Sequence, residues 1–136
     1  MNRPILIGYQ VLIGLSDTLA GALLIISPEF ALRLMRLHVA ADALPFLSFI
    51  GAFVFSVGLA CFYGAFVIAR RGSPCRVGVV WVLTAITRAS VAIFIAAQIL
   101  AHTLEAGWLT VAVSDGACVL IQAIGLRRGW LFHVAR

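Results

Sequence analysis

Charged side chains are scarce in this sequence, and lysine is missing altogether. The chain has ten arginines and five acidic residues among 136 residues, so only 11% of its residues are charged, whereas 63% are hydrophobic. A soluble domain usually has about 25% charged and 45–50% apolar residues. The composition therefore excludes an ordinary soluble domain, and the length allows a single domain over residues 1–136.

Residues that support cofactor, metal or nucleophilic chemistry are missing where they would be needed. A haem in a helical bundle requires histidines within the apolar runs, but all three lie in connections or the tail: His38, His102 and His133. The cysteines lack the paired spacing of a zinc site or disulfide framework: Cys61, Cys75 and Cys118. The phosphate-binding loop, the dinucleotide-binding glycines and the serine–histidine–aspartate set are absent too. We expect no cofactor and no metal, and no motif indicates a reaction.

What the sequence does have is four apolar runs. They cover residues 4–27, 45–69, 77–100 and 107–126, and a bilayer is crossed by about 20 helical residues. The first run is longer than the apolar part of a signal peptide and contains Asp17, so we expect it to be a membrane span. Short connections place consecutive spans antiparallel. The sequence therefore predicts an all-α, integral membrane four-helix bundle with up-down-up-down topology.

The connection after the first run has helical signals of its own. Ser27, Pro28 and Glu29 fit an N-cap, a first helical position and an acidic first turn. Apolar residues follow at helical spacing. We expect a short interfacial helix over residues 28–39.

The placement of the arginines indicates the orientation. With four spans, only Arg33 and Arg36 lie on one side, and seven arginines lie on the other: Arg3, Arg70, Arg71, Arg76, Arg127, Arg128 and Arg136. Because positively charged loops stay in the cytoplasm, both termini are expected there. The arginines do not form a stripe interleaved with aromatic residues, which argues against nucleic acid as a partner and leaves the lipid bilayer.

Three charged residues interrupt the apolar runs: Asp17, Arg88 and Asp115. An ion at the bilayer centre costs roughly 2.5–3.5 kcal/mol even on lenient scales, so each needs a reason. The helical rise places them about 15, about 18 and about 12 Å from the outer ends of their helices, which is one layer. Side chains lean toward the N-terminus of their helix. We therefore expect Asp17 to be the better-placed partner of Arg88, and Asp115 to need water or a bend.

Further polar residues share helix faces with these charges. Gln10, Thr84 and Gln122 each lie on the face of the charged residue of their own span, at about 100° per residue. The two glutamines lie two turns toward the inner side of their aspartates. The sequence thus predicts an amide layer below the charged layer.

The second span carries no charge. Every fourth position carries a small residue: Ala52, Ser56, Ala60 and Gly64. Such a ladder lets helix backbones approach closely. We expect this span to be the packing partner of the others. Trp108 and Trp130 are interpreted as anchors at the two membrane boundaries, with Phe132 and the flanking arginines continuing an amphipathic tail at the inner headgroups.

The three charges sum to −1 if all are ionised. Arginine keeps its proton, whereas desolvation and repulsion between carboxylates favour a proton on one aspartate. Asp115 is the expected proton carrier, because Asp17 matches Arg88 better in depth.

Some residues carry a resemblance to a known group. They are Gly14-Leu15-Ser16-Asp17 with Ala20-Gly21 in the first span, Pro28-Glu29-Phe30 after it, Arg88 in the third span, and Trp108 and Asp115-Gly116 in the fourth. With four short-looped spans over the whole chain, the sequence resembles the DoxX-like small bacterial membrane proteins. The resemblance implies a multi-pass protein of the bacterial cytoplasmic (inner) membrane, from a group in which some members act as partners of redox enzymes. It supplies no catalytic residue.

Three functions are compatible with these residues. The favoured one is a non-enzymatic membrane component whose charged layer either orders the bundle or lines a small polar pocket. The alternatives are a small, oligomeric proton-coupled carrier or channel, and an intramembrane enzyme acting on an isoprenoid or sterol-like lipid. The partners to expect are a second copy or another membrane protein, and a small polar or lipid-soluble ligand.

Overall fold

The structure, a computed structural model, describes residues 2–131. Its elements follow in the order α1 (Arg3–Ile26), α2 (Pro28–Met35), η1 (Ala41–Ala43), α3 (Leu44–Ala69), α4 (Pro74–Leu100), η2 (Ala106–Trp108) and α5 (Leu109–Arg127). The two η elements are short 3-10 turns, and residues 2–131 contain no strand. The all-helical fold expected from the sequence is confirmed.

Four segments are long and apolar enough to cross a membrane: Arg3–Ile26, Ala41–Ala69, Pro74–Leu100 and Ala106–Arg127. They match the four apolar runs closely, which indicates a multi-pass membrane protein. α4 begins three residues before the predicted position. Pro74 explains it, because proline fits the first turn of a helix, where no backbone N–H is needed.

The helix expected over residues 28–39 is shorter than predicted. It begins at Pro28 as expected, but the side chain of Ser27 makes no capping hydrogen bond. It ends at Met35 because Arg36 adopts the left-handed conformation, with φ of 56°. The N–H of Leu37 then donates to the carbonyl of Leu32 at 2.9 Å, which closes the helix end.

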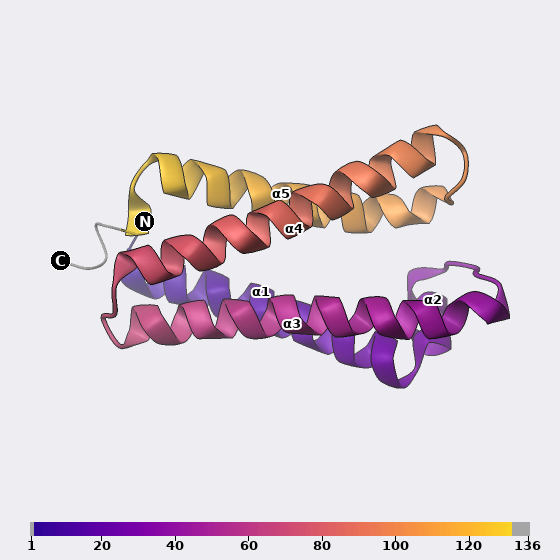
Figure 1. The fold of residues 1–136 in the computed structure, drawn as a ribbon, viewed down its shortest axis with the longest axis horizontal. Coiled ribbons are helices and arrows are strands. Elements are labelled where there is room, and N and C mark those ends of the chain that lie inside the picture. The colour runs from indigo at the N-terminus through magenta and orange to yellow at the C-terminus, as the bar shows by residue number, and fades with distance from the viewer. Residues whose placement is uncertain (1, 132–136) are drawn as a thin grey trace.

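The long helices pack as two pairs, as Figure 1 shows. α1 lies against α3, and α4 lies against α5. Between the pairs, backbones approach closely at fewer places, mainly from α3 to α4, and α1 meets α4 and α5 through side chains. The two pairs therefore depend on a few side chains to hold them together.

Glycines form the seam between α1 and α3. A Cβ at Gly21 would collide with the backbone nitrogen of Phe55, and a Cβ at Gly51 would lie 2.7 Å from the Cβ of Leu24. A Cβ at Gly58 would lie 2.8 Å from the carbonyl oxygen of Gly14. The two backbones approach as closely as they do because these positions carry no side chain.

The small-residue ladder predicted for the second span is not this seam. Ala52 and Ser56 are exposed, and Ser56 donates to the carbonyl of Phe53 in its own helix. These two members of the ladder face outward because a spacing of four residues drifts by about 40° per step around a helix with 3.6 residues per turn. Its last member, Gly64, is buried against Gln10 of α1, so the ladder prediction holds at that end. Gly51 and Gly58, seven residues apart, stay on one face and are buried.

Each end of the molecule has an apolar cluster. At the end that holds α2, Leu32, Leu37 and Leu47 are buried, and Trp108 packs against them. At the opposite end, where Figure 1 places the N-terminus, the buried cluster consists of Leu6, Val67, Ile68, Val77, Trp81 and Leu131. Trp130 packs against this second cluster. Trp108 and Trp130, which the sequence predicts to be membrane anchors, therefore also pack against the protein. Phe132 and Arg136 lie outside the described residues.

The end with the N-terminus is strongly basic, and we refer to it as the basic end. None of the five acidic side chains lies there. Six of the described arginines do: Arg3, Arg70, Arg71, Arg76, Arg127 and Arg128. Arg3 donates from Nε to the carbonyl of Ile68 at 3.2 Å, and so satisfies the last turn of α3. Arg70 lies over the ring of Phe66, 5.3 Å from its centroid. The α2 end holds two arginines and three acidic residues.

Candidate functional site

The structure brings the three charged residues of the apolar runs together into one charged layer. Arg88 of α4 donates from Nη2 to a carboxylate oxygen of Asp17 in α1, and from Nη1 to a carboxylate oxygen of Asp115 in α5. The Arg88 side chain is 7% exposed, and the aspartates are 15% and 14% exposed. A single guanidinium is thus shared by two carboxylates from two other helices.

The expectation that Asp115 needs water or a bend to reach Arg88 was wrong. The two aspartates contact different nitrogens of the same guanidinium, because its planar fork presents donors in two directions. An estimate of depth from Cα positions ignores the length of the arginine side chain, which spans the offset. The depth argument for Asp115 as the proton carrier therefore has no support in the geometry.

The charged layer also joins the two helix pairs. Asp17 belongs to the α1–α3 pair, whereas Arg88 and Asp115 belong to the α4–α5 pair. The bond from Arg88 to Asp17 links α4 of one pair to α1 of the other. The sparse packing between the pairs makes this bond important for their arrangement.

A second set of polar residues lies on the basic-end side of the charged layer, and we call it the amide tier: Tyr9, Gln10, Trp81, Thr84 and Gln122. Gln122 donates from Nε2 to Oγ1 of Thr84 at 2.9 Å, and Thr84 donates to the carbonyl of Val80 at 2.8 Å. Gln10 is fully buried, with its amide against the backbone of Gly64 in α3. The amide layer expected from Gln10 and Gln122 is therefore present inside the molecule, although no hydrogen bond joins the two glutamines.

Two residues near the site were missed at the sequence level. The ring of Tyr9 packs edge-on against Trp81, with centroids 5.9 Å apart. Tyr9 follows a glycine in an apolar run, and a tyrosine there is a signal, because a buried phenol needs a hydrogen-bond partner. Cys61 of α3 is fully buried close to Arg88. Its span carries no charge, so nothing in the sequence pointed to it. Cys118 of α5 is buried as well.

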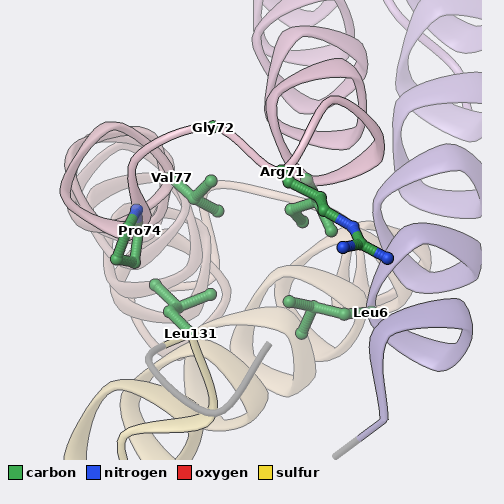
Figure 2. A pocket seen from close by; sticks show the side chains of 7 residues that line it. Leu6, Arg71, Gly72, Pro74, Val77 and Leu131 are labelled. Carbon is green, nitrogen blue, oxygen red and sulfur yellow. The ribbon is translucent and has the colours of Figure 1, made fainter. Parts of the chain in front are cut away.

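A small hollow lies between the basic end and the amide tier. Figure 2 shows Leu6, Val77 and Leu131 around it, together with Arg71 and the turn that contains Gly72. Its volume of about 10 Å³ is just enough for one water molecule. Leu6 and Val77 each lie one helical turn before a member of the amide tier.

The described residues do not assemble a metal site: within 2–131, no three histidine, cysteine or acidic side chains come close enough to hold an ion. At the α2 end, Nδ1 of His38 lies 3.9 Å from a carboxylate oxygen of Glu105, and both side chains are exposed. Comparisons of the chain with models of protein families, with curated proteins and with solved structures found no match.

Proposed function

We propose that this chain is a non-enzymatic component of a membrane, an up-down-up-down four-helix bundle that binds a small polar ligand between its two helix pairs. The observation that carries the proposal is the single guanidinium of Arg88 between carboxylates from α1 and α5. In this arrangement the charged layer orders the bundle, and the amide tier beside it lines the ligand site.

The ordering role follows from the cost of an unpartnered charge. Removing one member of a buried ion pair costs about 3–5 kcal/mol, because the other charge stays buried without compensation. Arg88 is 5% exposed, and it donates hydrogen bonds to one aspartate of α1 and to one aspartate of α5. Loss of Arg88 would strand two carboxylates at once.

The ligand-binding role follows from the amide tier. A purely structural ion layer needs no further polar groups, yet Gln10, Trp81 and Gln122 are at most 1% exposed and each has a polar atom without a partner among the described residues. Buried polar groups normally have partners. The tier is therefore suited to a ligand that supplies them.

The orientation and location are part of the same proposal. The basic end faces the cytoplasm, because arginine-rich loops are retained on that side of a membrane. The resemblance to the DoxX-like proteins supports the bacterial cytoplasmic membrane as the location. A membrane-protein partner or a second copy would contact the lipid-facing surface of the bundle.

The test of the charged layer compares three variants reconstituted in lipid nanodiscs. Arg88→Met is expected to lower the thermal midpoint strongly, because it leaves Asp17 and Asp115 unpaired. A triple variant removes all three charges by combining Arg88→Met with Asp17→Asn and Asp115→Asn. It is expected to recover much of the loss in thermal midpoint. Thr110→Val, at an exposed position whose hydroxyl donates to the nearby carbonyl of Gly107, controls for a general effect of substitution. A midpoint for Arg88→Met equal to that of the unmodified protein would refute the ordering role.

One observation favours a second function, a proton-coupled carrier. The three groups of the charged layer sum to −1 when all are ionised, so one bound proton makes the layer neutral. Infrared spectra of the protein recorded across pH should then show a protonated carboxyl band that is lost in Asp17→Asn or Asp115→Asn. Absence of this band at every pH would rule out the carrier.

A further inference from the structure

The amide tier holds both donors and acceptors that lack partners among the described residues. The unpartnered donors are Nε1 of Trp81, Nε2 of Gln10 and Nε of Arg88 at the border of the charged layer. The unpartnered acceptors are the amide oxygens of Gln10 and Gln122. These atoms come from three helices, α1, α4 and α5.

Several contacts show that these groups share one region. Tyr9 lies against Trp81, and Trp81 lies one turn before Thr84 on α4. Thr84 in turn holds the amide of Gln122. Gln10 reaches Gly64 at the place where Val80 of α4 also meets α3. The site is thus enclosed by all four long helices.

The chemistry of the site favours a neutral ligand. The tier itself contains no ionised side chain, and the charge of Arg88 is already matched by Asp17 and Asp115. An anion placed in the tier would lose its hydration without gaining a counter-charge, and a cation would find no carboxylate within the tier itself. A molecule that both donates and accepts hydrogen bonds would satisfy the glutamine oxygens and the indole N–H together.

On α1 and α4, the amide tier lies closer to the basic end than to the α2 end. At the basic end, Leu6, Val77 and Leu131 line the hollow of Figure 2, and all three belong to the same buried cluster as Trp81. We call these three residues the seal. On α1 and on α4, Leu6 and Val77 lie one turn from the amide tier, so a small displacement of either side chain would connect the hollow with the tier.

We infer that the amide tier binds a small neutral molecule that both donates and accepts hydrogen bonds, and that this molecule enters from the basic end through the seal. Water is the smallest such molecule, and a primary amide or an alcohol has the same chemistry. The inference rests on the ligand-binding part of the proposed function and is independent of the ordering role of Arg88.

The experiment follows the indole N–H of Trp81 by nuclear magnetic resonance in the ¹⁵N-tryptophan-labelled protein in nanodiscs. Trp81→Phe assigns the signal. We expect a cross-peak between this N–H and water, although Trp81 is fully buried. Replacing both glutamines, Gln10→Leu with Gln122→Leu, should weaken the cross-peak several-fold, whereas Thr110→Val on the lipid-facing side of α5 should leave it unchanged. Titration with formamide separates the two sources: a saturable shift of the Trp81 signal indicates a solute site, and a water cross-peak without a shift indicates a hydrated one.

The route has its own pair of variants. Leu6→Ala shortens the seal and should speed the exchange of the Trp81 N–H in D₂O several-fold, while Leu47→Ala, in the apolar cluster at the α2 end, should not. Faster exchange in Leu47→Ala alone would overturn the route. Slow exchange with no water cross-peak and no formamide shift in the folded protein would overturn the binding site. Neither result would bear on the charged layer, because Arg88, Asp17 and Asp115 are intact in every variant.

Discussion

At the scale of single residues, the choice of arginine at position 88 matters more than its charge. A guanidinium offers five N–H donors in a planar fork and can serve two carboxylates on different sides, whereas an ammonium is a compact point charge. Arg88 uses this property by donating from Nη1 to Asp115 and from Nη2 to Asp17. The charged layer therefore depends on the geometry of the side chain.

The first prediction concerns Arg88→Lys, which keeps the charge but not the fork. The ammonium reaches one carboxylate well and leaves the other poorly paired, so we expect a loss of about 2 kcal/mol in the free energy of unfolding. Unfolding of the purified protein by SDS, followed by circular dichroism, measures this loss. Unchanged stability would mean that one carboxylate contact suffices.

The second prediction compares the two aspartates. Both accept a hydrogen bond from Arg88, and their exposed fractions of 15% and 14% are nearly equal. Asp17→Asn and Asp115→Asn should therefore each cost about 1–3 kcal/mol and differ by less than about 1 kcal/mol. The same SDS titration tests this. A large loss for Asp17→Asn alone would restore the ranking expected from depth along the helices.

At the scale of the helices, the inward faces of three spans could be predicted from the sequence and the face of α3 could not. In α1 the glutamine, glycine and aspartate stripe is polar enough to mark the inside, and Gln10, Gly14 and Gly21 are indeed buried. In α3 every position is apolar or small, so hydropathy does not distinguish a lipid-facing side from a packed one. The buried Cys61 and the Gly51–Gly58 seam become visible only when α1 is in place.

The third prediction tests this seam with two substitutions in the same helix. A Cβ at Gly21 would collide with the backbone of Phe55 and lie 2.7 Å from the carbonyl oxygen of Gly51, whereas a Cβ at Gly8 meets nothing within 4 Å. Gly21→Ala should therefore destabilise the protein by about 1–3 kcal/mol through overpacking. Gly8→Ala should stabilise it by up to about 1 kcal/mol through helix propensity. Equal effects in the SDS titration would contradict the close approach of α1 and α3.

At the scale of the whole molecule, the structure has two closely packed pairs, a polar region between them and an apolar cluster at either end. Apolar runs and their lengths were enough to predict the helices, and the charges were enough to predict where polar contacts gather. The connections were harder. The end of α2 is set by the left-handed conformation of Arg36, and the packing of Trp130 follows a turn at Gly129, with φ of 63°. Position 36 has no pattern that distinguishes it from a continuing helix. The glycine at 129, after two arginines, does signal a helix end, but it does not show that the chain turns back so that Trp130 packs against the protein.

The fourth prediction concerns orientation and uses a cysteine that the chain already has. Cys75 is exposed in the first turn of α4 at the basic end, whereas Cys61 and Cys118 are buried and should react little. If the basic end faces the cytoplasm, as its arginines indicate, a membrane-impermeant maleimide should label Cys75 in inside-out vesicles and not in intact spheroplasts. In a Cys75→Ser background, Thr103→Cys in the exposed connection between α4 and α5 should show the reverse pattern. Labelling of Cys75 from outside would place the basic end on the external side, and the arginines of this end would then need a partner other than the cytoplasmic leaflet to explain their position.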